Sequence, residues 1–340
     1  MRNYNIPSGK ILLGHGSGGR LMHSLIKELL LKKLNNPILK ELSDGALIDY
    51  KDRIAFTTDS FVVNPLFFPG GDIGKLAVCG TINDLVVMGA RPQYLALAFI
   101  IEEGLDYKIL EKITDSIAIS ARQAGVSFVT GDTKVVEKGA CDKIFINTSG
   151  IGKAIGSKKL SIRNIGPGDL IIVTGTIAQH GLAVLTKRKE LDLKFNIKSD
   201  CAALGDLIVP VMEKTRAVKF MRDPTRGGLA TTLNEIAENS GLGIIIDEKN
   251  IPISSKVKVA CELLGIDPLY IASEGRAILV VEKSASAKIL GLLKKHPKGR
   301  GAQVIGRVSD KPRGRVILNT ILGTERIVDM LTSEPLPRIC

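Results

Sequence analysis

The chain has 340 residues, 44% of them apolar and 24% charged, and a formal net charge of +12; this length allows two domains, and the composition is typical of globular proteins. No apolar stretch approaches the roughly 18 residues that span a bilayer, and the N-terminus does not resemble a signal peptide, so we expect a cytoplasmic protein without a membrane partner. Aromatic residues make up only 4% of the chain and tryptophan is absent, which leaves little material for stacking on bases. We therefore interpret the positive charge as a solvated basic face and expect no nucleic-acid partner.

The first elements predicted along the chain are a strand at residues 11–13 and a helix at residues 20–35, joined by a glycine-rich turn. This turn, Gly14 to Gly19, satisfies the dinucleotide-binding pattern G-x-G-x-x-G. A second strand that ends in an acid about twenty residues later is missing. We therefore favour an anion site made by backbone N–H groups at the helix start, with Gly16, Gly18 and Gly19 as candidate positions.

Carboxylates recur in the first half of the chain at places suited to a ligand. Asp59 follows a predicted strand at residues 53–58, and a second predicted strand, residues 126–130, leads into Gly131-Asp132-Thr133-Lys134. A predicted helix from Asp72 to Gly89 carries Asn83 and Asp84 in an otherwise apolar sequence, where polar groups are unfavourable unless they are paired or liganded. Together with Asp44, these acids are the ligands that Mg²⁺ bridged to phosphates requires, so we predict a metal or phosphate site.

The remaining pattern predicts two lobes of mixed strands and helices, an α+β fold. We divide the chain into a first domain at residues 1–154, a linker at 155–168, a second domain at 169–322 and a C-terminal tail at 323–340. In the second domain, Asp223-Pro224-Thr225-Arg226-Gly227-Gly228 repeats the order acid, threonine and cation that is found at Asp132 to Lys134. The chain contains no P-loop pattern G-x-x-x-x-G-K-[ST]. The run Gly70-Gly71-Asp72-Ile73-Gly74-Lys75 comes nearest, but Pro69 stands where the first glycine of the pattern should be.

The last residue is a cysteine, which is unusual chemistry for a chain end. Pro335 and Pro337 stiffen the approach to it, since each fixes φ near −65°. The other four cysteines are scattered without a C-x-x-C pair, which argues against a zinc site or a disulfide framework. We interpret the tail as an arm that carries a reactive thiol on Cys340. We expect it to dock with Ile339 against an apolar surface and with Cys340 pointing towards a groove lined by Lys134 and Asp132. The alternative is a frayed terminus with an incidental cysteine.

Several motifs together resemble a known family. They are HGSGG (15–19), TTDSF (57–61), GGDIGKLAVCGTINDLVVMGA (70–90), GDTKVV (131–136), DPTRGGL (223–229), ASEGR (272–276) and the terminal PRIC (337–340). The internal motifs resemble the superfamily of aminoimidazole ribonucleotide synthetase, selenophosphate synthetase and thiamine-phosphate kinase. With the terminal cysteine, the whole chain resembles the HypE family of hydrogenase maturation proteins, the carbamoyl dehydratases.

The resemblance implies that Cys340 receives a carbamoyl group from a HypF-like carbamoyltransferase. ATP then activates the carboxamide oxygen, loss of phosphate leaves a thiocyanate on sulfur, and cyanide passes to iron held by a HypC/HypD-like scaffold for a [NiFe]-hydrogenase. It also implies an aminoimidazole ribonucleotide synthetase-like fold in which the first domains of a homodimer pair into a β-barrel, with a flexible tail.

The resemblance also implies roles for individual residues. Asp44, Asp59, Asp84 and Asp132 would hold Mg²⁺ with ATP, Lys134 would bind the phosphates, and Glu274 is the candidate base. Glu274 has an alternative interpretation as a surface residue in a turn. Further candidates for nucleotide binding are Asp72, Lys75, Asn83, Thr133 and the three glycines of the N-terminal turn.

Other functions remain as alternatives at this stage. A kinase or synthetase of the same superfamily that acts on a small metabolite would have no use for Cys340. A dinucleotide-dependent oxidoreductase depends only on the glycine-rich turn, and a scaffold or RNA-binding module depends only on charge.

Overall fold

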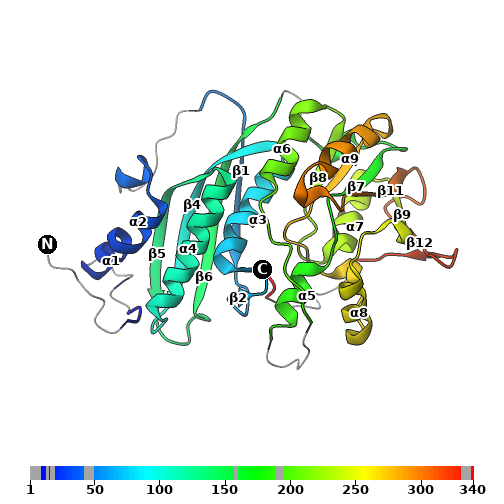
Figure 1. Ribbon diagram of the computed structural model, residues 1–340. Coiled ribbons are helices and arrows are strands. Elements are labelled where there is room, and N and C mark those ends of the chain that lie inside the picture. The colour runs from blue at the N-terminus through cyan, green and yellow to red at the C-terminus, as the bar shows by residue number, and fades with distance from the viewer. Residues whose placement is uncertain are drawn as a thin grey trace.

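A computed structural model of the chain describes residues 9–12, 15, 20–41, 50–156, 160–188, 195–330 and 338–340. Two mixed lobes lie side by side, and the C-terminus lies between them, near β2 and α5 (Figure 1). Each lobe has its own sheet. None of the helices in the described part of the chain is long and apolar enough to cross a membrane.

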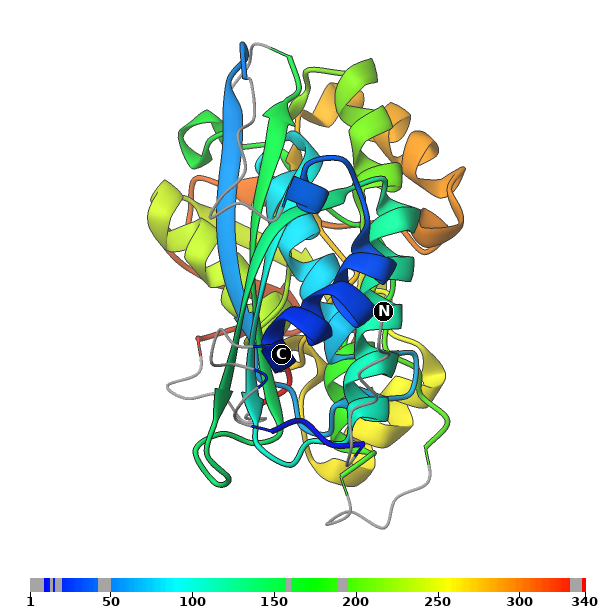
Figure 2. The same cartoon turned by 90° about the vertical axis from the view of Figure 1, so that its left-hand side faces the viewer.

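The first domain contains a four-stranded sheet in the order β1-β6-β4-β5. Its pairs are antiparallel except for the parallel pair β4 and β5. Figure 2 shows the long strands side by side, with α3 and α4 packed to one side of them. The elements are α1 (Arg20–Leu25), a π-helical turn (Ile26–Leu30), α2 (Leu31–Leu34), β1 (Ile54–Phe61), β2 (Phe67–Phe68), β3 (Gly71–Asp72), α3 (Ile73–Val87), β4 (Ala90–Glu102), α4 (Tyr107–Ala124), β5 (Ser127–Val136) and β6 (Ile144–Ala154).

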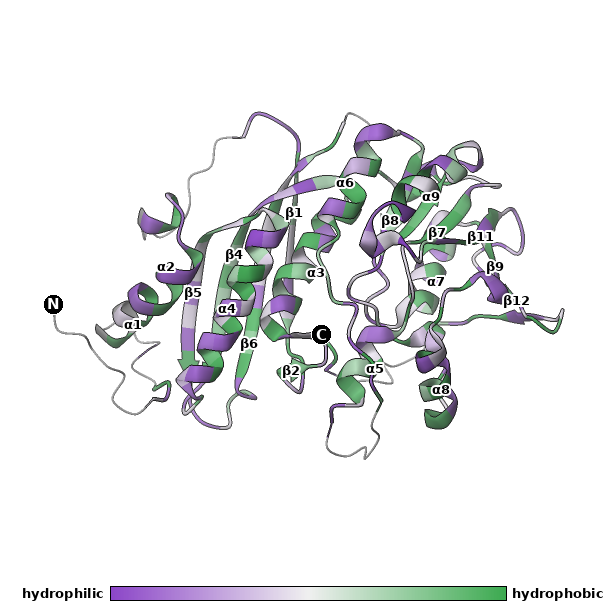
Figure 3. Cartoon of the chain, viewed as in Figure 1, coloured by the Kyte–Doolittle hydropathy of each residue, from purple (hydrophilic) through white to green (hydrophobic). Residues whose placement is uncertain are grey.

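The helices α3 and α4 differ in how much of their surface is buried, and the sequence predicts this difference. Nearly every residue of α3 is buried, because this helix lies between the first sheet and the second domain. In α4 hydrophobic and hydrophilic residues alternate in bands (Figure 3), with Leu110, Ile113 and Ile117 turned inward. The helix ends at Gly125, whose φ of +70° suits glycine.

In the part of the chain that the structure describes, no helix covers the other face of the first sheet. The residues of β1 that alternate away from α3 are exposed, and the Phe56 side chain is 67% accessible. Ile54 on the same strand and Ile100 on β4 are also exposed. Large exposed apolar side chains that share one sheet face mark a surface suited to an interface. We refer to this surface as the open face.

The second domain contains a seven-stranded sheet in the order β13-β12-β9-β11-β7-β10-β8. The pair β9 and β12 is parallel and the others are antiparallel. The elements are β7 (Leu170–Val173), α5 (Gln179–Leu185), α6 (Gly205–Lys214), β8 (Val218–Arg222), α7 (Gly228–Ser240), β9 (Gly243–Asp247), α8 (Ser255–Leu264), β10 (Ile278–Val281), α9 (Ser286–Lys294), β11 (Gln303–Ser309), β12 (Val316–Asn319) and β13 (Glu325–Ile327).

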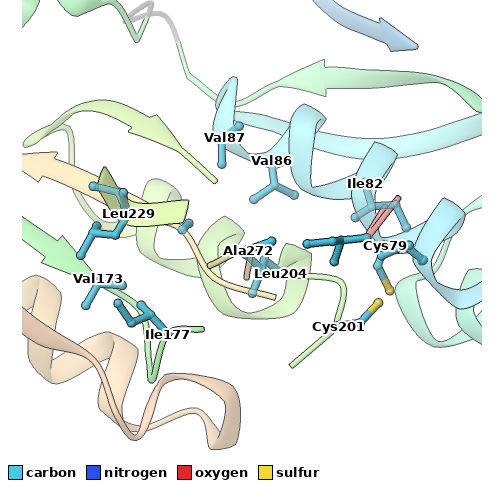
Figure 4. Close-up of a cluster of buried hydrophobic side chains, with 14 of the residues drawn as sticks. Cys79, Ile82, Val86, Val87, Val173, Ile177, Cys201, Leu204, Leu229 and Ala272 are labelled. Atoms are coloured by element: carbon cyan, nitrogen blue, oxygen red, sulfur yellow. The ribbon is translucent and has the colours of Figure 1, made fainter. Parts of the chain in front are cut away.

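One buried cluster joins the two domains. In Figure 4, the α3 side chains face residues of the second domain, and the sulfur atoms of Cys79 and Cys201 lie next to one another. Both thiols are free. The labelled members of this cluster are Cys79, Ile82, Val86, Val87, Val173, Ile177, Cys201, Leu204, Leu229 and Ala272.

The structure differs from the sequence prediction in several places. Ile11 and Leu12 do not form a strand, and Leu13 lies outside the described residues. The predicted helix at residues 20–35 is interrupted by the π-helical turn. Helix α6 and the strands β8, β12 and β13 were not predicted, and β13 extends the second sheet to Ile327, beyond the predicted end of that domain.

Candidate active site

The end of the chain is docked between the two domains. The Ile339 side chain is only 4% exposed, so the prediction that it packs against apolar surface is confirmed. The Ile339 carbonyl accepts a hydrogen bond from His180 Nε2 at 2.9 Å. Arg338 has a φ of +56°, and its carbonyl accepts from the backbone N–H of Asn64 at 3.2 Å and from the Arg188 guanidinium at 3.1 Å. Hydrogen bonds to backbone carbonyls therefore fix Arg338 and Ile339.

The docked terminus brings Cys340 to Glu274. The Cys340 side chain hydrogen-bonds the Glu274 carboxyl, while Oε1 of Glu274 has no hydrogen-bond partner among the described residues. Glu274 is 3% exposed, so its interpretation as a surface residue is wrong. Burial raises the pKa of this carboxyl well above its usual range, and the charges of Asp223, Asp200 and Asp59 raise it further.

Residues from both domains hold the backbone of Glu274. The buried Asp200 carboxylate accepts from the N–H groups of Glu274 at 3.3 Å and Gly275 at 3.4 Å, and it lies 3.6 Å from Nε of Arg276. On the other side, Asn83 Nδ2 of α3 donates to the Glu274 carbonyl at 3.0 Å. The carboxyl is therefore placed by the junction of the domains and not by a turn alone.

Three aspartates, Asp59, Asp84 and Asp223, gather near this junction, and burial raises the pKa of each. Burial and the charge of Asp59 raise the pKa of Asp84, which also accepts from Thr57 Oγ1 at 2.9 Å. Burial, followed by the charges of Asp84 and Asp59, raises the pKa of Asp223 to about 7. Burial likewise raises the pKa of Asp59, and Arg226 lies 3.9 Å from Asp59 Oδ1.

This aspartate cluster has the charge that a divalent cation would neutralise. In the described part of the chain, no three His, Cys, Asp or Glu side chains are arranged to hold a metal ion by themselves. Mg²⁺ bound together with phosphates needs only one or two carboxylates, since the phosphates and water supply the other oxygens. The residues present therefore fit Mg²⁺ that arrives with a nucleotide, and they do not fit a resident metal site.

Asp132, Thr133 and Lys134 lie elsewhere in the first domain. They are on β5, the edge strand opposite β1. Asp132 and Lys134 are exposed and 3.5 Å apart, and their neighbour Thr133 is buried. The alternation places Asp132 and Lys134 on the open face, whereas Asp59 Oδ2 lies near Gly80 on the helix-covered side. A single chain thus does not bring the predicted aspartates into one site. Within one chain Cys340 does not point towards Lys134 and Asp132 as expected, because the side chain that it meets, Glu274, comes from the second domain.

Three other candidates make structural bonds. Asp72 caps α3 by accepting from the N–H groups of Gly74 at 2.8 Å and Lys75 at 3.1 Å. The Lys75 ammonium donates to the Gly70 carbonyl at 2.9 Å. Asn83 is 1% exposed, and its hydrogen bonds to described residues all go to backbone groups of the second domain. The last four candidates, Asp44, Gly16, Gly18 and Gly19, lie outside the described residues.

The sequence analysis did not select Asp223, Asp200 or His180. Asp223 had a usable signal, because the similar order of residues at Asp132 to Lys134 had already been noted. Asp200 and His180 carry no local signal, since their partners lie 74 and 159 residues away along the chain.

Family models describe both halves of the chain. The N-terminal domain of AIR synthase related proteins matches residues 42–154, and the C-terminal domain of the same proteins matches residues 166–319. The two-domain fold and the acidic junction thus define a protein of the AIR synthase related class.

Individual relatives specify the family within this class. The chain is 46% identical to the carbamoyl dehydratase HypE of Rhodobacter capsulatus, over 97% of this chain and 98% of that protein. A crystal structure of hydrogenase maturation protein HypE in complex with ATP superposes with a TM-score of 0.94 at 46% identity, covering 97% of this chain and 99% of the other. A crystal structure of a HypE–HypF complex gives a TM-score of 0.80 at 49% identity, over 91% and 100% of the two chains. The chain belongs to the HypE family of carbamoyl dehydratases.

Proposed function

We propose that this protein is an ATP-dependent carbamoyl dehydratase whose substrate is a carbamoyl group on its own Cys340. The product is a thiocyanate on the same sulfur, which supplies the cyanide ligand for the iron of a [NiFe]-hydrogenase. The observation that carries the proposal is the contact of the Cys340 side chain with the buried Glu274 carboxyl at the domain junction. A small-molecule kinase with this fold would not need its last residue there.

The reaction balances with one ATP. An amide oxygen is a poor leaving group, so ATP transfers its terminal phosphoryl group to the carbamoyl oxygen, and one N–H proton is lost to give an imidate phosphate. Loss of phosphate with the second N–H proton leaves the C≡N triple bond on sulfur. A base close to the sulfur substituent is needed for these protons.

Glu274 is suited to this role by its position and its environment. It touches the side chain that carries the substrate, and one of its oxygens has no protein partner in the described residues. A raised pKa makes the ionised carboxylate a stronger proton acceptor than an ordinary glutamate.

The aspartate cluster would hold the metal that accompanies ATP. Asp59, Asp84 and Asp223 are the candidate ligands, and Mg²⁺ there would supply positive charge to the phosphates. Ionisation of the three carboxyls is unfavourable without a cation, because burial raises the pKa of each and the charges of neighbouring aspartates raise those of Asp84 and Asp223 further.

We propose that the open face is the dimer interface, so that two first-domain sheets close into a barrel. Its exposed apolar residues Ile54, Phe56 and Ile100 support this, because a sheet normally buries its apolar face against another layer. Asp132 and Lys134 lie on the same face, and in a dimer they would come close to the partner subunit. They therefore remain candidates for binding ATP phosphates, at the joint between subunits.

Two kinds of protein partner follow from the chemistry. A HypF-like carbamoyltransferase would load Cys340, in keeping with the solved HypE–HypF complex of a relative. A HypC/HypD-like scaffold that carries iron would take the cyanide.

The test is mass spectrometry of the full-length protein incubated with a carbamoyl donor system, with and without ATP. Carbamoylation should not require ATP hydrolysis by this protein, and the later loss of one water should require ATP. Both mass changes should map to the C-terminal peptide. Deleting Ile339 and Cys340 should leave ATP binding intact and abolish both modifications. Replacing the half-exposed Cys141 by serine is the matched control, and it should change neither. If the truncated protein still carries both modifications, Cys340 is not the carrier.

A further inference from the structure

His180 lies on α5 directly beneath the docked terminus. It is fully buried, and Phe68 contacts its ring edge-to-face with centroids 5.2 Å apart. Its Nε2 lies 2.9 Å from the Ile339 carbonyl and its Nδ1 lies 2.8 Å from Ser199 Oγ. A carbonyl only accepts, so Nε2 carries a proton. Burial lowers the pKa of His180, so the ring is neutral and Nδ1 accepts from the Ser199 hydroxyl.

The loop that contacts His180 also contacts Glu274. Ser199 orients the imidazole through its hydroxyl, which in turn accepts from the Cys201 N–H at 3.0 Å. The next residue, Asp200, holds the N–H groups of Glu274 and Gly275. The Ser199 backbone N–H donates to the Pro69 carbonyl at 2.8 Å, which ties this loop to the first domain. Two adjacent residues, Ser199 and Asp200, thus hold His180 under the tail and the backbone of Glu274.

We infer that His180 is a positioning residue that fixes the carrier tail. Ser199 holds His180 and the adjacent Asp200 holds Glu274, so this one loop sets the position of Cys340 relative to Glu274. The inference rests on the proposed function, because only a carrier thiol requires this alignment. His180 touches no reacting atom, since it holds the carbonyl one residue before the cysteine. His180 holds the tail next to Cys340 through one buried hydrogen bond to the Ile339 carbonyl. Loss of this donor would leave the buried carbonyl unsatisfied, which is unfavourable.

The experiment compares three histidine variants of the full chain in two assays. His180→Leu removes the donor and keeps apolar volume, while His180→Gln restores it, because the glutamine amide nitrogen reaches about as far as Nε2. His296→Leu, in the second domain at the N-cap of a short 3-10 turn, is the matched control. One assay follows single-turnover dehydration of carbamoylated protein at saturating ATP. The other follows alkylation of the unmodified Cys340 thiol by iodoacetamide, with Cys141 as the internal reference.

His180→Leu should slow dehydration by about tenfold, the effect of one orphaned buried acceptor. It should also raise Cys340 alkylation relative to Cys141, with ATP affinity unchanged. His180→Gln should recover most of both effects, which a loss of packing alone would not produce. His296→Leu should behave as the wild type. The inference is overturned if His180→Leu dehydrates at the wild-type rate, or if His180→Gln is as slow as His180→Leu while both bind ATP normally.

The two hypotheses fail in different ways. If the wild-type protein never dehydrates its carbamoyl group, the proposed function is wrong, and alkylation alone then decides the role of His180. Equal protection of Cys340 in the wild type and in His180→Leu would show that the histidine does not hold the tail. Faster alkylation in His180→Leu, reversed in His180→Gln, would show that it does.

Discussion

Replacing Asn83 by alanine should lower the free energy of unfolding by about 3 to 5 kcal/mol. This is the cost of losing three hydrogen bonds and of leaving their backbone partners unsatisfied at the junction. Asn83 Nδ2 donates to the carbonyls of Ala202 at 3.1 Å and Glu274 at 3.0 Å, and Oδ1 accepts from the Leu204 N–H at 2.8 Å. All three partners belong to the second domain. Alanine would leave them buried at the junction without a donor or acceptor.

The assay is thermal and chemical unfolding of the variant beside Asn234→Ala. Asn234 is also buried, but its two bonds, to the carbonyls of Ala230 and Val328, stay within the second domain. We expect Tm to fall by on the order of 10 °C in Asn83→Ala, with a smaller fall in the control. Dehydration should also slow in Asn83→Ala alone, because the Glu274 carbonyl loses its tie to α3.

One result would refute this reasoning. If Asn83→Ala keeps the wild-type Tm but no longer binds ATP, the side chain is a ligand of the nucleotide, as its place in an apolar helix first indicated. The three backbone contacts would then contribute nothing to holding the domains together.

Three further predictions concern the reaction. Asp84→Asn should abolish turnover and weaken Mg²⁺-dependent ATP binding about tenfold or more; unchanged binding by calorimetry would remove Asp84 from the metal site. Lys134→Ala should still accept the carbamoyl group and fail at dehydration, so normal dehydration in single-turnover mass spectrometry would exclude a phosphate role for this lysine. The raised pKa of Glu274 means that the folded protein keeps a proton that the unfolded chain releases. As pH rises between the unfolded and folded pKa values, the free energy of unfolding of the wild type relative to Glu274→Gln should therefore fall by about 1.4 kcal/mol per pH unit. Urea unfolding of both proteins from about pH 5 to pH 8 measures this difference, and a gap independent of pH would show that Glu274 is ionised throughout.

The sequence predicts the elements whose patterns are local. Helix α4 follows from its apolar spacing and its glycine C-cap, and α3 from its aspartate N-cap and apolar run. Helix α6 was missed, because Pro210 stands inside it and a proline ordinarily argues against a helix interior. Strand β13 is three exposed residues long, too short for any periodicity to indicate it.

The candidate site residues that the sequence selects stand in local motifs, and those that it does not select depend on the fold. Asp59, Asp84 and Glu274 stand in recognisable motifs and lie near the domain junction. Asn83 was interpreted as a ligand residue, because the backbone groups that satisfy it come from the other domain and no sequence pattern shows them. In the sequence His180 is only a histidine in an apolar segment, because its contact with the C-terminal tail is visible only in the folded structure.

The buried Ile339 side chain sets a requirement for every protein that exchanges a group with Cys340. Burying an isoleucine contributes roughly 2 to 3 kcal/mol, and the tail gives this up whenever the thiol leaves its docked position. A partner that grips only the cysteine would work against that loss, and transfer would be slow however reactive its own centre is. A partner with an apolar pocket for Ile339 beside its reactive centre makes the exchange nearly neutral in free energy. The proposed loading enzyme and the proposed cyanide acceptor would perform unrelated chemistry, but both should therefore recognise the same aliphatic side chain.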